Sequence, residues 1–295
     1  MLTKKKIHHL KTGEFTFEIE SNVAEIDSYL QTYYQQERLM DNQGNFIDFH
    51  VSLTHSYGYR QFIKPQVYFS FNHNTFFNPL PISQAHLALE WGLNWVIATQ
   101  AHQYLVIHAA SLEKEGKGLI IAAPSGSGKS TLCAYLVSQG WQLLSDEHAL
   151  VHRETLKMHA ISRPINLKNQ SIDLIKPLYS NKNISLPVEN THKGTISLLS
   201  VPETSKEPVR PRLLVFVQYD KDEELFIERV DKASALVEVI KNSFNFAQLN
   251  TEGFKCARRL VEQCNAYYVE YSNLAACEQV LTKHLQGVAK YENIS

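Results

Sequence analysis

The fold of this chain is indicated by the stretch Ala123-Pro124-Ser125-Gly126-Ser127-Gly128-Lys129-Ser130-Thr131, which follows the apolar run Leu119-Ile120-Ile121-Ala122. Its two glycines let the backbone bend, so that successive N–H groups can point inward at an anion. An apolar strand that leads into such a loop, with a helix beginning at the lysine, is typical of a phosphate-binding loop. The stretch opens with Ala123 where the usual pattern has glycine. We therefore expect an α/β fold that binds a nucleoside triphosphate.

The polar groups of this loop each have an expected partner on the nucleotide. Lys129 brings a positive charge to the outer phosphates, and the Ser130 hydroxyl is the expected ligand of the nucleotide's Mg²⁺. The helix that begins near Lys129 adds its positive N-terminal dipole to the same anion. The alternative is a plain Gly-Ser turn between two elements. The expected nucleotide-binding residues are Pro124, Ser125, Gly126, Ser127, Gly128, Lys129, Ser130 and Thr131.

The composition is that of an ordinary globular protein. The 295 residues are 44% hydrophobic and carry a formal net charge of -1, so no whole-chain field attracts nucleic acid or anionic lipid. The basic cluster Lys4-Lys5-Lys6, with His8, His9 and Lys11, is expected to be a solvated tail. No apolar stretch follows it, so a signal peptide is not expected, and no later run reaches transmembrane length. The four cysteines lack zinc-site spacing and are expected to be buried thiols. These observations predict a cytoplasmic protein without nucleic-acid or membrane partners.

The patterns divide the chain into two parts. Residues 1–100 hold short alternating runs such as Val67-Tyr68-Phe69-Ser70-Phe71, followed by a helical pattern over 83–100. They are predicted to form a small α+β module to which no role is assigned. Residues 101–295 are predicted to form the nucleotide-binding domain, a mixed sheet with helices packed around it. Within this domain, residues 179–191 contain Asn, Ser and Lys and are expected to form a mobile loop.

A histidine and an acidic pair are expected beside the loop. If the turn before the loop centres on residues 115–116, antiparallel partners have numbers that sum to about 231, and His108 lies opposite Ala123. Asp146 follows Lys129 by 17 residues, which is enough for one helix and a returning strand. Its carboxylate should therefore emerge at the same edge of the sheet as the phosphates.

Each of these residues also has a simpler explanation. His108 can be a core histidine on a buried strand, and Asp146 with Glu147 can be a turn that ends a strand. In a third interpretation the acidic pair still acts on a bound nucleotide, but the reaction is hydrolysis. In it Asp146 holds Mg²⁺ and Glu147 activates a water molecule, as in many ATPases. The chain would then be a P-loop ATPase or a nucleotide-switched binding module.

The order of these pieces resembles the HPr kinase/phosphorylase superfamily, and most closely its branch called HprK-related kinase A. The superfamily has a histidine, a short glycine-containing turn, a Ser-Gly-x-Gly-Lys-Ser loop, one helix and an acidic pair. The corresponding residues here are His108, Gly116, Gly118, Ser125 to Ser130, Leu132 to Gly140, Asp146 and Glu147. Three further stretches are similar to the branch: Ser162 to Lys168, His192 to Thr195 and Ser243 to Asn245.

The resemblance implies a kinase that uses ATP and Mg²⁺ to phosphorylate a hydroxyl, expected to be serine, of a protein, peptide or small molecule. It implies Asp146 as the general base and His108 as a contact to the acceptor or the transferred group. Lys129 would stabilise that group during transfer. Ser130 and Glu147 are the expected Mg²⁺ ligands, with Glu147 in the place of the superfamily's second aspartate.

The chain also departs from the superfamily. The proline-glycine-arginine-asparagine stretch linked to reverse phosphorolysis is absent, so neither that activity nor HPr as the acceptor is expected. Arg163 and Lys193 are candidates for extra charge compensation, and an exposed surface role is the alternative for each. Because the superfamily assembles into oligomers, a homo-oligomer is a further expectation from the resemblance.

Overall fold

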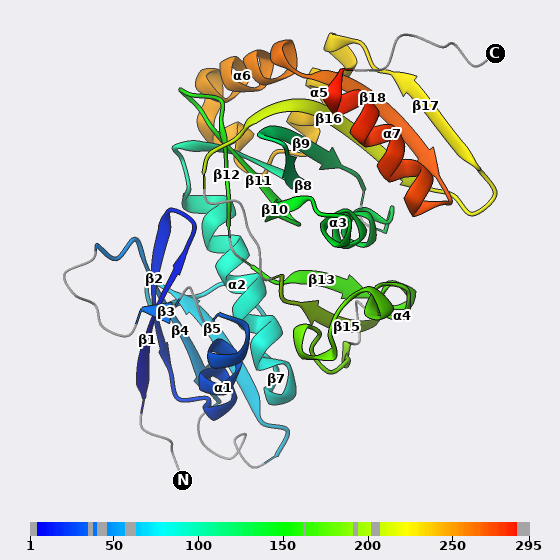
Figure 1. Cartoon of the computed structure of the whole chain (residues 1–295). Helices are drawn as coiled ribbons and strands as arrows, with labels where there is room; N and C mark the ends of the chain where they lie inside the picture. Colours follow the sequence, from blue (N-terminus) through cyan, green and yellow to red (C-terminus); the bar gives the residue numbers. More distant parts are fainter. Residues whose placement is uncertain are drawn as a thin grey trace. The chain divides into compact units, whose positions relative to one another are not determined.

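A computed structural model describes residues 5–34, 38–39, 46–56, 63–124, 126–161, 163–190, 194–201 and 207–287. The chain folds as two compact units (Figure 1). Unit 1 holds residues 1–101 together with 161–164, and unit 2 holds 102–160 and 165–295. The sequence predicted a single boundary between residues 100 and 101, and it did not predict that residues 161–164 belong to unit 1. No helix in the described ranges is long and apolar enough to cross a membrane.

Unit 1 is built on a seven-stranded sheet and two helices. The sheet order is β3-β1-β2-β4-β5-β6, with β7 paired to β5. In β2, Phe17 and Ile19 are buried whereas Glu18 and Glu20 are less so, because successive side chains of a strand point to opposite faces. The elements are β1 (Lys6–Thr12), β2 (Phe15–Ser21), α1 (Ala24–Tyr33), β3 (Arg38–Leu39), β4 (Phe49–His55), β5 (Gln66–Phe71), β6 (Asn74–Thr75), β7 (Leu80–Pro81), the 3-10 helix η2 (Ile82–Gln84) and α2 (Ala85–Gln100). The helix predicted over 83–100 is thus confirmed, whereas the expectation of a solvated tail is wrong for Lys6, His8, His9 and Lys11, which lie in β1 and pair with β2.

Unit 2 is built on a mixed eight-stranded sheet. The strand order is β12-β11-β8-β9-β16-β18-β17, with β10 paired to β8. The strands are β8 (Tyr104–Lys114), β9 (Lys117–Ala122), β10 (Gln142–Ser145), β11 (His148–His152), β12 (Met158–His159), β16 (Arg210–Tyr219), β17 (Leu225–Arg229) and β18 (Asn265–Tyr271). The helices packed on it are α3 (Lys129–Ser138), α5 (Lys232–Lys241), α6 (Phe246–Gln263) and α7 (Leu274–Gln286). The chain is therefore a mixed α/β protein, as expected.

Helices cover both faces of the large sheet. Leu119 and Ile121 of β9 belong to a core that includes buried residues of α3 and α7. Ile120 and Ala122 belong to a second core with buried residues of α5 and α6. A strand covered on both faces has apolar residues throughout instead of alternating ones. This explains the unbroken apolar run before the loop.

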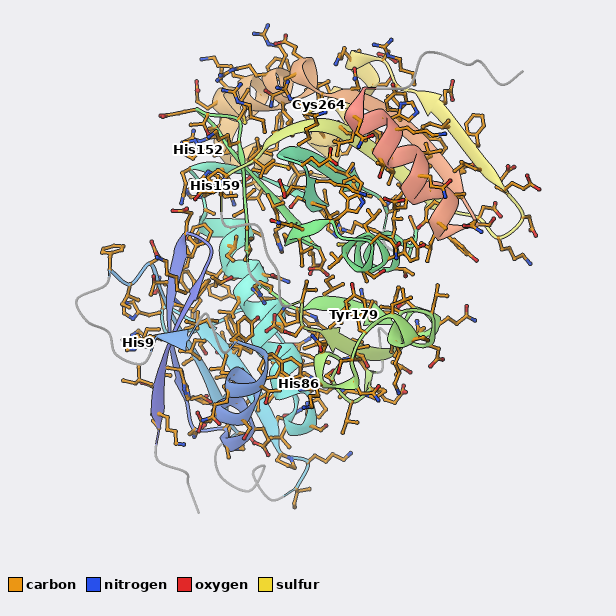
Figure 2. The ribbon with its side chains drawn as sticks, in the orientation of Figure 1. His9, His86, His152, His159, Tyr179 and Cys264 are labelled. Carbon is orange, nitrogen blue, oxygen red and sulfur yellow. The ribbon has the colours of Figure 1, made fainter. Side chains whose placement is uncertain are left out.

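A three-stranded sheet completes unit 2. It has the order β13-β15-β14 and consists of β13 (Ile165–Lys168), β14 (Val188–Asn190) and β15 (Gly194–Leu199), with α4 (Gln170–Ile175) and the 3-10 helices η3 (Lys176–Leu178) and η4 (Asn181–Asn183) between them. The segment predicted as a mobile loop differs from that expectation over its described residues 179–190, which contain η4 and β14. Tyr179, labelled in Figure 2, donates its hydroxyl to the Ala134 carbonyl at 2.6 Å. The segment is thus tied to α3.

The register of the hairpin before the loop confirms the sequence prediction. Ala109 pairs with Ala122 and Lys114 with Lys117, which is the register predicted from a turn at 115–116. Strands β9, β16 and β18 are parallel to one another, so their carboxyl ends lie at one edge of the sheet. All four cysteines are free and buried, as predicted. Figure 2 labels one of them, Cys264.

Candidate functional site

The loop between β9 and α3 has the backbone conformation that its glycines allow. Gly126 has φ +89° and Gly128 has φ +84°, values that side-chain-bearing residues seldom adopt. The Ser127 hydroxyl donates to the Pro124 carbonyl at 2.9 Å. Helix α3 begins at Lys129, directly after Gly128. The loop therefore bends sharply into a helix N-terminus, where N–H groups have no partners within the helix.

Lys129 is the most unusual group at this edge. The residue is only 9% exposed, and its Nζ atom has no hydrogen-bond partner among the described residues. Burial lowers the pKa of Lys129, and the nearby carboxylates of Asp146 and Glu147 oppose this effect. A buried cation that neither donates a hydrogen bond nor forms an ion pair is rare unless an anionic ligand meets it.

The acidic pair lies between β10 and β11. One carboxylate oxygen of Asp146, Oδ2, accepts a hydrogen bond from the backbone N–H of Asn166 at 3.0 Å. The Ser145 hydroxyl accepts from the N–H groups of Glu147 and His148. These bonds hold the turn after β10. Because β10 and β9 are both antiparallel to β8, the turn emerges at the same edge as the loop.

Glu147 lies among cationic and imidazole groups. Burial raises the pKa of Glu147, but the electrostatic effects of His148, Lys129, His108 and Lys168 outweigh it and hold the pKa below its ordinary value. Glu147 is therefore an anion at neutral pH. Its field acts on the Lys129 ammonium together with that of Asp146.

His108 pairs across β8 and β11 with a second histidine, His148. The ring of Phe244 contacts both imidazoles, with centroid distances of 5.3 Å to His108 and 5.1 Å to His148. Burial lowers the pKa of His108 to about 4, Lys129 and Lys168 add to this effect, and Glu147 opposes it. His108 is thus a neutral imidazole at pH 7.

The segment that carries Phe244 is fixed to β8. Phe244 N donates to the Val106 carbonyl at 2.9 Å, and His108 N donates to the Asn242 carbonyl at 2.7 Å. The fully buried side chain of Asn245 accepts from Val106 N and donates to the Tyr104 carbonyl. Phe244 itself stays 47% exposed. The structure thus holds the backbone at Phe244 in place and presents a half-exposed aromatic ring beside the two histidines.

Sequence reasoning gave no role to three residues of this site: His148, Lys168 and Phe244. The sequence could have predicted a place for His148 in the site, because this residue directly follows the acidic pair. The stretches Ser162 to Lys168 and Ser243 to Asn245 resemble a known family, but that resemblance implies no role for Lys168 or Phe244. Nothing in the sequence linked Phe244 to His108, which precedes it by more than a hundred positions.

The remaining predicted site residues lie as follows. Ser130 and Thr131 are half-buried on the first turn of α3. Ser125, which belongs to the predicted loop, and Lys193, a candidate for charge compensation, lie outside the described residues. Each of these assignments stays a prediction.

Arg163 has a different environment from the one predicted. It belongs to unit 1, where it is buried and forms an ion pair with Glu90. Its Nη2 also donates to the Glu90 carbonyl at 2.7 Å, and the hydroxyls of Tyr29 and Tyr34 donate to Glu90 Oε1. Its positive charge is therefore balanced within unit 1, and we assign it no part in phosphate binding. An exposed surface role is excluded as well.

The donor set suits a metal ion that arrives with a nucleotide. Within the described ranges, no group of three or more His, Cys, Asp or Glu side chains could hold a metal ion. Nucleotide-bound Mg²⁺ needs only one or two protein ligands, because phosphate oxygens and water supply the others. The Ser130 hydroxyl and the Glu147 carboxylate are oxygen donors of the kind that Mg²⁺ prefers.

Comparisons with known proteins show likenesses to a protein family and to solved structures. A family model described as "SynChlorMet cassette protein ScmC" matches residues 83–165, well under half of the chain. No curated protein matches. Among solved structures, the HPr(Ser) kinase/phosphatase from Coxiella burnetii is 14% identical, over 62% of this chain and 97% of that chain, with a TM-score of 0.31. The chain is therefore similar to ScmC over residues 83–165 and, too weakly to bear on its activity, to a protein of the superfamily that its sequence resembles.

Proposed function

We propose that this chain is a kinase that transfers the γ-phosphoryl group of ATP to a hydroxyl of a protein, peptide or small molecule. The observation that carries the proposal is the buried Lys129 ammonium, which has no hydrogen-bond partner among the described residues. A triphosphate would give it one. The loop N–H groups and the N-terminus of α3 would bind the same anion.

Asp146 is the general base of the proposed reaction. The acceptor oxygen forms a bond to the γ-phosphorus as the bond to the bridging oxygen of ADP breaks, and the acceptor proton passes to Asp146. The Asn166 N–H holds one oxygen of the base in place. Lys129 and the loop N–H groups stabilise the charge on the transferring group. When bound by Ser130 and Glu147, Mg²⁺ neutralises charge on the phosphates.

His108 contributes as a neutral group. With its pKa lowered to about 4, its imidazole has one N–H donor and one acceptor nitrogen at pH 7. It can therefore orient the acceptor hydroxyl without adding a second cation beside Lys129. The Phe244 ring packs against it and against the ring of His148.

A second candidate function is an ATPase or a nucleotide-dependent switch. The observation that favours it is the position of Glu147, an anion whose field reaches both Lys129 and His108. In this case Asp146 holds Mg²⁺ and Glu147 activates a water molecule. No acceptor is then needed for turnover.

The experiment uses isotopically labelled ATP, Mg²⁺ and a lysate from the same source, with mass spectrometry of the labelled products. We expect label on one peptide or metabolite. The Asp146→Asn variant should lower this labelling by about 10²–10⁴-fold while nucleotide affinity is retained. Asp173→Asn, an exposed change on α4 in the same unit, is the matched control and should label as the unmodified protein does.

Other outcomes would contradict the kinase or the role of Asp146. If label appears solely as free phosphate, and Glu147→Gln traps bound ATP, the chain is an ATPase. If Asp146→Asn labels the acceptor at the normal rate, Asp146 is not the base. An Asp173→Asn variant that loses activity would show that the assay responds to stability instead of chemistry.

A further inference from the structure

Asn166 joins the small sheet of unit 2 to the base of the proposed reaction. It pairs with Leu198 in the β13–β15 ladder, which fixes its position along the strand. Its backbone N–H donates to Asp146 Oδ2 at 3.0 Å. The side chain of Asn166 therefore belongs to the same residue whose backbone binds the carboxylate that would take the acceptor proton.

The side-chain carbonyl of Asn166 is unsatisfied. Its Oδ1 atom is buried and has no hydrogen-bond partner among the described residues. Buried side-chain oxygens nearly always accept at least one hydrogen bond, so an exception needs an explanation. Another unsatisfied atom, Lys129 Nζ, belongs to a side chain on which the charges of this acidic pair act, and a phosphate oxygen would satisfy it. The two groups require opposite partners, because one is a donor and the other an acceptor.

The triphosphate cannot satisfy Asn166. Ionised phosphate oxygens only accept hydrogen bonds, and a carbonyl oxygen brought against them would be repelled. A donor N–H or O–H would satisfy it, as would a cation, and in a transfer reaction the second substrate can bring the donor. The backbone N–H of Asn166 is already engaged with the base, so a donor at Oδ1 would lie beside the reacting hydroxyl.

Lys168 adds a charge to the same strand face. It follows Asn166 by two positions in β13, so the two side chains point to one side of the strand. Lys168 is exposed, and its charge acts on both His108 and Glu147. An acidic group on an incoming molecule would be attracted to this position.

We propose that Asn166 is a specificity-determining residue for the phosphoryl acceptor, a conclusion that rests on the proposed kinase function. Its side-chain carbonyl accepts a hydrogen bond from an N–H or O–H donor next to the acceptor's reacting hydroxyl. Lys168 binds an acidic group of the same molecule. The acceptor class is thus a hydroxyl compound with a neighbouring donor and a negative charge, as opposed to an uncharged simple alcohol.

The test compares Asn166→Leu with Asn166→Asp. The leucine variant keeps the backbone bond to Asp146 and the side-chain size but removes the acceptor oxygen, whereas the aspartate variant keeps an oxygen there. The probe is the lysate fraction that the unmodified protein labels with isotopic ATP, used in a dilution series. Nucleotide affinity is measured in parallel with a fluorescent ATP analogue.

We expect Asn166→Leu to lower labelling at limiting acceptor by about 10- to 100-fold, as for loss of a hydrogen bond to a buried group. Concentrated acceptor should restore the rate, because the loss is in KM and not in kcat. Asn166→Asp should retain most of the labelling, and Lys168→Gln should also raise KM. Nucleotide affinity should stay within about twofold in Asn166→Leu and Lys168→Gln, because no hydrogen bond to phosphate is lost.

Ser197→Ala is the matched control. Ser197 lies opposite Leu167 in the same ladder, and its hydroxyl donates to the Ser185 carbonyl at 3.2 Å. The change disturbs the small sheet without touching the site. If it reduces labelling as much as Asn166→Leu does, Asn166 is merely structural and the proposal is overturned.

The other outcomes are equally decisive. Equal labelling by the unmodified protein and Asn166→Leu overturns the proposal and leaves the kinase intact. A parallel loss of nucleotide affinity assigns Asn166 to the nucleotide or its Mg²⁺ and also overturns it. Loss of labelling in Asn166→Asp as large as in Asn166→Leu shows that an oxygen at this position is not enough, and it overturns the role of Oδ1 as the recognising acceptor. If the unmodified protein labels nothing, both the proposed function and this inference fail.

Discussion

The hydroxyl of Tyr271 donates a hydrogen bond to the carbonyl oxygen of Gly128, with 3.4 Å between the two oxygen atoms. A second contact comes from the neighbouring strand, where Tyr219 N donates to the Ser127 carbonyl at 3.1 Å. The ends of β16 and β18 thus support the loop from the side opposite to the acidic pair.

This support makes Gly128 intolerant of a side chain. A Cβ atom there would lie 2.9 Å from the Tyr271 hydroxyl and 3.1 Å from Tyr219 Cβ, at φ +84°. Gly140 has the same φ but no heavy atom within 4 Å of such a Cβ. We expect Gly140→Ala to cost about 1–2 kcal/mol from backbone strain, and Gly128→Ala to cost about 1–3 kcal/mol more from crowding. Urea unfolding of both variants measures the difference, and equal costs would contradict it.

Lys129 should oppose stability while it supports binding. Replacing it by methionine removes a buried cation that has no hydrogen-bond partner among the described residues, and keeps the apolar volume. We expect the thermal midpoint of the ligand-free Lys129→Met protein to be unchanged or higher. The rise in midpoint that ATP and Mg²⁺ give the unmodified protein should vanish. A variant that is clearly less stable without ligand would show that the ammonium has a structural partner.

His108 should link stability to pH. Burial, with Lys129 and Lys168, lowers its pKa from an ordinary 6.5 to about 4, so the unfolded chain binds a proton in this interval and the folded one does not. Stability contributed by the neutral imidazole is therefore present above pH 6.5 and is lost as pH falls toward 4. Urea unfolding at several pH values above 5 should show this fall, and His108→Gln should reduce it. An equal fall in both proteins would assign the effect to other groups.

The same histidine should take up a proton when the nucleotide binds. A triphosphate at Lys129 adds negative charge beside the imidazole and raises its pKa. Calorimetric titration with ATP and Mg²⁺ near pH 5.5, in two buffers of different ionisation enthalpy, would reveal the uptake. The His108→Gln variant should show less. Identical heats in both buffers for the unmodified protein would count against a phosphate near His108.

The Glu90–Arg163 pair should behave as a coupled unit. Burial lowers the pKa of Arg163, but Glu90 and the tyrosines outweigh it and hold the pKa above its usual value. Arg163→Met leaves the Glu90 carboxylate buried without its cation, which should cost about 3–5 kcal/mol. Removing both charges, with Glu90→Gln added, should recover a large part. A double-mutant cycle by urea unfolding tests this, and additive effects would show that the pair is not coupled.

Local patterns were enough to predict the elements around the loop. The hairpin register follows from one turn, and α3 follows from a helix start at Lys129 and a stop at Gly140, whose φ is +84°. These features depend on neighbours within a few residues. For the same reason α2 and the buried cysteines were predicted correctly.

The contacts that the sequence did not predict join distant positions. Phe244 contacts His108 because the side chain of the next residue, Asn245, accepts a hydrogen bond from the backbone of β8. Hydrophobic periodicity does not predict such a bond. Arg163 looked like a free cation, since its partner Glu90 lies 73 positions away. The sequence alone does not show whether a charged side chain is buried or exposed to solvent.

The return of residues 161–164 to unit 1 means that no single cut separates the two units. Expressing residues 102–295 alone would carry Arg163 without Glu90, Tyr29 or Tyr34, and expressing 1–101 alone would leave Glu90 without its cation. Each fragment would therefore contain one charged residue of the pair without its partner. Dissection of this chain into independently folding pieces therefore calls for compensating changes at both Glu90 and Arg163, designed together with the boundaries.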